Sequence, residues 1–567
     1  MRRETFLALQ KELVRQQKRR MKQYIEQTPE LEEYYEEYRR ELSRYSVLSY
    51  PEELVQKALA SRVVYIGDFH TLLQSQRFAE RLMDRIAQRR CGPLVLAMEA
   101  FPASCQAAVD RYVSGAIDRD ALLSEVDYRR TWGFPPEGYL RLLDKCREIG
   151  ARVAALNSFP RKGGDVLERR DRFAGRILAR ILADQPEALV VVLIGDLHVA
   201  TGHLPEVVID FLGRRGVTIR DLIIYLNSES LYWQLARDGL EYLVNVVKVD
   251  SRSYCVFNAT PLAKYDSYLR FVEGLVDEDP EDEDDAVLAG SVVVEDQVTD
   301  WARRIAESLD IPFDPPTNVE LVPCADMDRE GDSIARAVGA SGDEVPLVGA
   351  SVRASQPIFV GGSRLLLHRF SLNDAADAAA RVLLTSHGWH PYFDKSRNSF
   401  YYNVLFEALV YFGSKVINPK RTVKRDADLA AWVEQRSRTR RRSRDGLDVQ
   451  VLSRFVLPHI RSLDRLVNQG KGFRESPALY GFALAKRMLA MRLLGRRLGE
   501  RLFFSANVGL STRTRMAGQR GSVGHREIAW HYRHPPAGGT DTRARYLQVW
   551  KSIGDVVEHH RSRQEWF

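Results

Sequence analysis

The chain has 567 residues, which exceeds what one hydrophobic core usually organises, so we expect two or more domains. Hydrophobic residues make up 45% and charged residues 28%, which is ordinary for a soluble globular protein. Much of the excess behind the net charge of +7 sits in an arginine-rich run near residue 440, so we expect no nucleic-acid binding by the chain as a whole.

The five cysteines are scattered and form no CxxC pair, which argues against a disulfide scaffold and against a cysteine-zinc site. The polar residues that follow Met-Arg-Arg give no apolar core for a signal peptide. The longest apolar run, Ala188–Ile194, is too short to span a bilayer. We therefore expect a cytoplasmic protein without a membrane span.

Residues 1–60 are rich in Lys, Arg, Glu and Tyr, with Phe6, Leu9 and Leu13 at helical spacing. This pattern predicts a charged helical arm of one or two helices. Its expected role is to pack against the rest of the chain or to form a homodimer contact.

Residues 61–275 alternate short apolar runs with helical patterns, which is typical of a mainly parallel sheet with flanking helices. The runs are rich in Val, Ile and Leu and suit strands covered on both faces. The four clearest are Arg62–Ile66, Leu94–Met98, Arg152–Leu156 and Leu189–Ile194. Later runs, Leu222–Leu226 and Leu243–Val249, are expected to extend this sheet.

One short sequence motif, Gly-Asp-x-His, occurs twice in this region. The first strand ends in Gly67-Asp68-Phe69-His70, and the fourth ends in Gly195-Asp196-Leu197-His198. The second and third strands lead to Glu99 and Asn157. The carboxyl ends of parallel strands meet at one edge of a sheet, where ligands bind, so we expect these side chains to share one ligand.

The residue types allow several chemistries. Imidazole and carboxylate are ligands for Mn, Zn, Fe or Co, which makes His70, His198, Glu99 and Asp196 candidate metal ligands. Glu99 or Asp68 could then take a proton from a metal-bound water. The same histidines beside an apolar wall could hold haem iron. A purely structural interpretation also exists, in which Gly forms a turn and Asp caps the next helix.

Residues 61–272 resemble the ChaN-like haem-binding uptake proteins of the Tiki superfamily, which also includes erythromycin esterases, TraB-type proteins and Tiki proteases. The resemblance rests on seven stretches in the same order: Tyr65–His70, Leu96–Phe101, Gln106–Gly115, Trp132, Tyr139–Asn157, Arg170–Phe173 and Ile194–Pro205.

The resemblance implies a pocket lined by His70, Glu99 and His198. It also implies that Arg172 faces this pocket and anchors a carboxylate, such as a haem propionate or a substrate acid. We count Asn157 among the residues that contact a cofactor. Two departures stand out, because Asp68 replaces the usual Glu and His203 replaces a small residue. His203 is expected to decorate a loop, with an additional ligand as the alternative.

The acidic run at 277–285 cannot bury itself, so we expect an acidic linker over residues 276–299. Residues 300–567 are then a mostly helical, basic domain of unknown function. Strand-like pieces are expected within Leu347–Phe370. Helices are expected at Asp374–Leu384, Tyr401–Val416, Val449–Val467 and Ser476–Gly499. The aromatic residues of Tyr401–Val416 are expected to form helix core.

Three functions follow from these observations. The leading hypothesis is a protein that holds haem or a divalent transition metal through His70 and His198. The second is a metal-dependent hydrolase in which Glu99 or Asp68 activates water and Arg172 orients an acidic group. The third is a scaffold whose pocket has degenerated.

Overall fold

The computed structural model describes most of the chain, namely residues 3–25, 28–158, 165–274, 283–314, 320–323, 333, 335–336, 339–340, 342, 344–353, 357–360, 364–367, 371–437, 448–511, 525–537 and 541–553. The acidic run up to residue 282 and the arginine run from residue 438 lie outside these ranges. None of the described helices combines the length and the apolar character needed to cross a bilayer.

The chain divides into two compact units, each of which is described by itself. Unit 1 comprises residues 1–12 and 277–559, and unit 2 comprises residues 13–276 and 560–567. The division passes through the first helix, α1 (Arg3–Met21).

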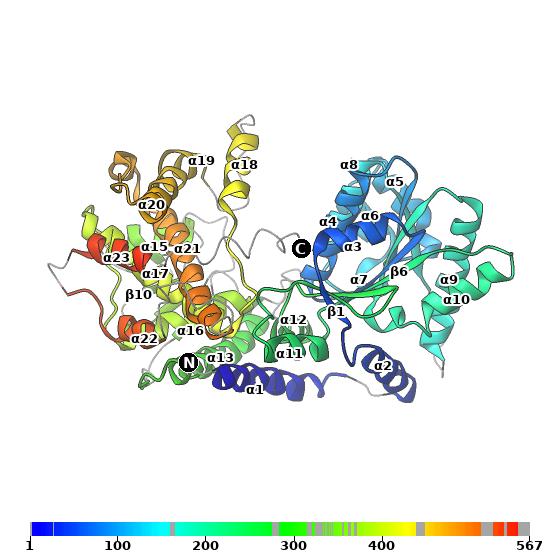
Figure 1. The fold of residues 1–567 in the computed structure, drawn as a ribbon, viewed down its shortest axis with the longest axis horizontal. Coiled ribbons are helices and arrows are strands. Elements are labelled where there is room, and N and C mark those ends of the chain that lie inside the picture. Colours follow the sequence, from blue (N-terminus) through cyan, green and yellow to red (C-terminus); the bar gives the residue numbers. More distant parts are fainter. Residues whose placement is uncertain are drawn as a thin grey trace. The chain divides into compact units, whose positions relative to one another are not determined.

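Unit 2 is built on an eight-stranded sheet with the strand order β1-β7-β8-β6-β2-β5-β3-β4. Figure 1 labels β1 and β6 of this sheet among the helices of unit 2. The six strands from β8 to β4 run parallel, and β7 and β1 add antiparallel pairs at one edge. This confirms the predicted mainly parallel α/β fold. The strands are β1 (Val47–Ser49), β2 (Val63–Asp68), β3 (Leu94–Pro102), β4 (Arg152–Asn157), β5 (Leu189–Gly195), β6 (Asp221–Leu226), β7 (Val246–Lys248) and β8 (Ser253–Val256).

Helices cover both faces of this sheet, which is why its central strands are apolar at every position. All residues of β2, β3 and β5 are buried. Alternate residues of these strands pack into one core with α3, α4, α5 and α8. The helices of unit 2 beyond α1 are α2 (Pro29–Glu41), α3 (Pro51–Leu59), α4 (Leu73–Ala87), α5 (Gln106–Val113), α6 (Arg119–Glu125), α7 (Tyr128–Thr131), α8 (Glu137–Ile149), α9 (Val166–Asp184), α10 (Leu204–Gly213), α11 (Glu229–Arg237) and α12 (Pro261–Val272).

Unit 1 is mostly helical and carries a small sheet with the strand order β10-β11-β9. Its strands are β9 (Glu320–Pro323), β10 (Ile358–Val360) and β11 (Arg364–Leu367). Its helices are α13 (Glu283–Leu309), α15 (Glu344–Arg353), α16 (Leu372–Ser386), α17 (Arg397–Ile417), α18 (Asp426–Ser437), α19 (Val449–Val451), α20 (Leu457–Gln469), α21 (Leu484–Ser511), α22 (His525–Arg533) and α23 (Thr542–Ile553).

The strand-like pieces expected within Leu347–Phe370 are β10 and β11, and the first part of this range belongs to the helix α15. Pro346 lies in the first turn of α15, where its missing N–H costs no helical hydrogen bond. The apolar residues that follow it, Leu347 and Val348, continue this helix.

The helix α17 forms the centre of unit 1, and its aromatic residues are buried as core. It packs closely against α21 because two glycines of α21 face it. A Cβ at Gly499 would overlap the carbonyl oxygen of Ala408, and one at Gly495 would lie 2.8 Å from the carbonyl oxygen of Val404. Any side chain at these positions would push the two helices apart.

Candidate functional site

The two repeated motifs follow neighbouring strands of the sheet. Asp68 at the end of β2 lies opposite Gly195 at the end of β5 in a parallel pair. His70 follows β2 by two residues, and His198 lies in the short 3-10 helix η2 (Asp196–Val199) that follows β5. Because parallel neighbours end at the same edge, both imidazoles lie at the carboxyl edge of the sheet.

Gly195 marks the point at which the predicted residues meet. A Cβ at this position would lie 3.4 Å from His70 Nε2, 3.3 Å from His198 Cδ2 and 3.5 Å from Glu99 Oε2. A larger residue would fill the space among these groups, and glycine keeps it open. The structure thus brings His70, His198 and Glu99 together around one glycine.

Glu99 lies within β3, where the register with β4 shifts between Met98 and Pro102. Such an irregularity re-aims side chains near a site. Glu99 is only 4% exposed, and its Oε2 accepts a hydrogen bond of 2.9 Å from Gly195 N. Its Oε1 accepts a charge-assisted hydrogen bond from Arg170. Burial raises the pKa of Glu99, but Arg170, followed by His198 and His70, lowers it to about 2, so this carboxylate is ionised at neutral pH.

A carboxylate fixes the orientation of His70. His70 Nδ1 donates to Asp68 Oδ2 at 3.0 Å. Asp68 also accepts 2.6 Å hydrogen bonds from Tyr139 OH and Gln76 Nε2, so its position is determined on several sides. With Nδ1 committed to Asp68, the nitrogen that His70 presents to Gly195 is Nε2.

His198 has the same arrangement, with different residues. Its Nδ1 donates to Asp171 Oδ1 at 2.7 Å, and Asp171 Oδ2 accepts a 3.0 Å hydrogen bond from Tyr34 OH. His198 Nε2 lies 4.0 Å from Glu99 Oε1. The site therefore contains two sets of tyrosine, aspartate and histidine in which each aspartate holds one imidazole.

The two carboxylates also set the basicity of the imidazoles. Burial lowers the pKa of each histidine, but the adjacent aspartate outweighs it, so the pKa of His70 and that of His198 lie above the ordinary value. Glu99 raises both further, while Arg170 opposes this effect at His198. Both rings are thus more basic than a free histidine.

Asp196 and Asn157 lie at the border of the site. Asp196 Oδ2 accepts a 2.8 Å hydrogen bond from Lys264 Nζ, and Lys264 is itself largely buried over the ring of Phe69. Asn157 Oδ1 accepts a long hydrogen bond of 3.4 Å from Arg170. The expected metal ligand Asp196 is therefore engaged by a lysine, and Asn157 helps to position Arg170.

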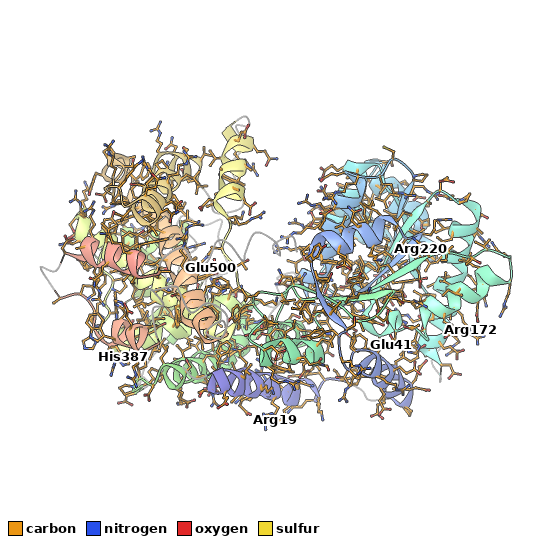
Figure 2. All side chains as sticks on the ribbon, viewed as in Figure 1. Arg19, Glu41, Arg172, Arg220, His387 and Glu500 are labelled. Carbon is orange, nitrogen blue, oxygen red and sulfur yellow. The ribbon has the colours of Figure 1, made fainter. Side chains whose placement is uncertain are left out.

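The expectation that Arg172 faces the pocket is wrong. Its side chain is 61% exposed and pairs with Glu168 one turn earlier on α9. Figure 2 labels Arg172. Arg170 reaches Glu99 instead. Because each residue of an α-helix is rotated by about 100° from the last, positions 170 and 172 lie on nearly opposite faces of α9.

Residues on one face of α2 contact α9 and the segment that follows His198. Glu30, Tyr34, Glu37 and Glu41 follow helical spacing and lie on one face. Glu30 accepts hydrogen bonds from the first backbone N–H groups of α9, and Glu41 accepts one of 2.8 Å from Thr201 N. The predicted charged arm therefore contributes Tyr34 and three carboxylates to the surroundings of the site.

His203 is neither a loop decoration nor part of the constellation. It is 8% exposed, and its ring stacks on Tyr34 at 3.6 Å between centroids. Its Nε2 lies 3.0 Å from Glu37 Oε2. His203 thus packs against the ring of Tyr34, whose hydroxyl bonds Asp171.

Partly exposed rings adjoin His70. Trp132 and Phe134 lie 4.6 and 4.8 Å from its ring, and Phe271 lies 5.0 Å from Phe134. All three are only partly buried. This aromatic wall (Trp132, Phe134 and Phe271) offers an apolar surface next to an imidazole.

Sequence reasoning missed Arg170, Asp171 and Lys264. Asp171 had a detectable signal, because it lies on the buried face of α9 with Ala174 and Leu178. An acid on an apolar helical stripe indicates a buried partner. Lys264 had no such signal, since its partner is set only by the folded chain.

Among the described residues, no group of three or more His, Cys, Asp or Glu side chains is arranged to hold a metal ion. The predicted set of His70, His198, Glu99 and Asp196 is not brought together as such a group. Glu99 and Asp196 instead pair with Arg170 and Lys264.

Residues 54–163 match a protein-family model, which is described as haem-binding uptake, Tiki superfamily, ChaN. This segment is similar to the ChaN family of the Tiki superfamily. The ChaN match includes Asp68, His70, Glu99 and Asn157, and it ends before α9 and the second motif. No curated protein sequence matches the chain.

Two solved structures are similar to parts of the chain. One describes cofacial haem binding to ChaN of Campylobacter jejuni, at 12% identity and a TM-score of 0.25, covering 31% of this chain and 86% of that protein. The other is the type III effector HopBA1, at 14% identity and a TM-score of 0.26, covering 37% of this chain and 95% of that protein.

Proposed function

We propose that unit 2 binds haem at the carboxyl edge of its sheet, with His70 and His198 as the residues that reach the iron. The observation that carries this proposal is the convergence of both rings on Gly195, with Nδ1 of each held by an aspartate. A carboxylate on one ring nitrogen orients a histidine so that its other nitrogen can bind a metal.

The residues fit a haem group. Haem iron needs only one or two axial ligands from the protein, and histidine is a common one. The aromatic wall beside His70 provides an apolar surface for a flat macrocycle. When bound, haem would supply an iron centre whose properties depend on these ligands and their hydrogen bonds.

A bare divalent metal fits less well. A catalytic zinc site commonly uses three protein ligands. Here the two carboxylates that could join the histidines are already neutralised, Glu99 by Arg170 and Asp196 by Lys264. A metal would have to displace one of these cations, which favours haem among the two cofactors.

A Tiki-type hydrolase is the second candidate, and the Asp171–His198 pair favours it. An imidazole held by a buried aspartate is suited to accept a proton. Glu99, with a pKa of about 2, is a poor base at neutral pH. In this alternative we therefore assign proton transfer to His198 and the orientation of an acidic group to Arg170.

Titration of the purified full chain with haemin tests the proposal. We expect a shifted Soret band that saturates at one haemin per chain. The His70→Ala variant should bind at least tenfold more weakly, which corresponds to about 1.4 kcal/mol, while the control His390→Ala should bind as the wild type does. His390 is an exposed residue of unit 1. Unchanged binding by His70→Ala would contradict the assignment.

The same preparation distinguishes the hydrolase. Turnover of generic ester substrates by haem-free protein, abolished in His198→Ala and retained in His390→Ala, would favour the second candidate. Haemin binding without turnover would favour the first.

A further inference from the structure

A pocket in unit 1 lies among five of its elements and has a cavity volume of about 80 Å³. It is contributed by α15, β10, α16, α17 and α21 together with the segment before α17. The pocket is partly open to solvent, so a ligand larger than this volume would extend out of it. Nothing in the ChaN segment, which ends at residue 163, assigns a role to it.

The pocket has an apolar body. Its outer residues, Leu347, Phe359 and Phe393, are partly exposed, whereas Met488 and Met491 are buried deeper. Methionine side chains are flexible and adapt to ligands of varied shape. The lining therefore suits an apolar or aromatic group.

Arg381 brings a charge to this apolar lining. It is 5% exposed, its Nη2 donates to Glu407 at 2.5 Å, and its guanidinium lies over the ring of Phe406 at 5.3 Å. Its buried Nε has no acceptor among the described residues. A buried N–H without an acceptor is costly, so an acceptor oxygen from a ligand would stabilise it.

The surroundings of Arg381 favour an anion over a neutral ligand. Asp377 is shared between Arg421 and Arg496, so two carboxylates face three guanidinium groups in this network.

We propose that this pocket binds an amphipathic organic anion, with its apolar body between the methionine and phenylalanine side chains and its acid group on Arg381. The bound carboxylate would accept the Arg381 Nε–H and balance the excess positive charge of the network.

Calorimetric titration of the full chain with decanoate and with 1-decanol tests this inference. We expect saturable binding of decanoate and at least tenfold weaker binding of decanol. Leu347→Trp should fill the outer part of the pocket and weaken decanoate binding at least tenfold. Val345→Trp is the matched control, because Val345 lies on the same helix, is partly buried and does not line the pocket.

The role of Arg381 needs a variant that leaves no unpaired buried charge. The double variant Arg381→Met with Glu407→Gln removes both members of the ion pair. We expect it to lose the preference for decanoate over decanol. The inference is overturned if wild type shows no saturable decanoate binding, if it binds both ligands equally, or if Leu347→Trp and Val345→Trp behave alike.

Discussion

The central residues of unit 2 are two histidines that gain their chemical character from buried aspartates. Each aspartate also accepts a hydrogen bond from a tyrosine, Tyr139 for Asp68 and Tyr34 for Asp171. Such a partner fixes which ring nitrogen carries the proton and raises the basicity of the other. The same arrangement serves a metal ligand and a general base, which is why both candidate functions use the same histidines.

Arg170 and Arg172 provide a matched pair of variants. Arg170→Met would leave Glu99 buried without its cation, and loss of one member of a buried pair costs about 3–5 kcal/mol. Arg172→Met removes only an exposed pair and should change stability by less than about 0.5 kcal/mol. Urea denaturation followed by circular dichroism measures both. Equal losses would contradict the placement of Glu99.

His459 predicts a pH dependence of stability in unit 1. It is fully buried, and its burial, followed by the charge of Arg543, lowers its pKa to about 3. His459 is therefore protonated below about pH 6.5 in the unfolded chain, whereas in the folded chain it stays neutral down to about pH 3. Stability from this group is complete above about pH 6.5 and falls by about 1.4 kcal/mol per pH unit as pH drops from 6.5 towards 3.

The variant His459→Gln removes this proton and keeps a group able to bond the hydroxyl of Tyr546, which lies 3.2 Å from His459 Nε2. Its unfolding free energy should fall less steeply between pH 6 and 4.5, because one fewer proton is taken up on unfolding. The slope should be smaller by about 1.4 kcal/mol per pH unit. The exposed His390→Gln should retain the wild-type slope. An unchanged slope in His459→Gln would show that this residue is protonated in the folded chain.

The structure brings together residues that stood in motifs at strand ends, whereas a helix face decided which arginine lies near them. His70, His198 and Glu99 were all proposed from sequence, and the structure places them around Gly195. Arg172 was chosen over Arg170 because the resemblance gave a stretch of residues and no rotation of α9. Only the packed helix shows which arginine points inward.

At the scale of elements, α2 is the part of the charged arm that matters for the site. Tyr34→Phe would remove the hydrogen bond to Asp171 and keep the ring that stacks on His203. A hydrogen bond to a charged group contributes about 1.5–3 kcal/mol, so we expect a loss of that size and weaker haemin binding.

Tyr38→Phe is the control on the same helix. Tyr38 is equally buried, and its hydroxyl has no hydrogen-bond partner among the described residues. We expect no loss of stability in this variant. Denaturation and haemin titration of both proteins should separate them, and similar behaviour would remove α2 from the account of the site.

The contact between α17 and α21 makes a second prediction at this scale. Gly499→Ala places a methyl group against the carbonyl of Ala408, and overpacking of this kind costs about 1–3 kcal/mol. Gly472→Ala is the control, since a Cβ there would meet nothing within 4 Å. Thermal unfolding should show a lower midpoint for Gly499→Ala alone. Equal midpoints would contradict the close approach of these helices.

The elements themselves were predictable to different degrees. The central strands of unit 2 were found because β-branched runs buried on both faces have few alternatives. The helix α15 was not predicted, because a short apolar run fits either a helix or a strand. The role of α2 was missed because its contacts join residues more than a hundred positions apart.

At the scale of the whole molecule, each unit carries one candidate site. Unit 2 holds the histidines around Gly195, and unit 1 holds the pocket that contains Arg381. We propose that residues 300–567 form a ligand-binding domain with its own chemistry, separate from the ChaN segment. Its function was beyond sequence reasoning, because the residues that line its pocket are spread over five elements with no local motif.

A double-mutant cycle on haemin affinity tests most directly whether the two histidines act on one ligand. The wild type, His70→Ala, His198→Ala and the double variant would each be titrated under the same conditions. If both rings reach one haem, the losses of haemin-binding free energy in the two single variants should differ from additivity by about 0.5–3 kcal/mol. The double variant should then bind haemin about as tightly as the single variant with the lower affinity. Additive effects, or wild-type protein without saturable haemin binding, would contradict the account.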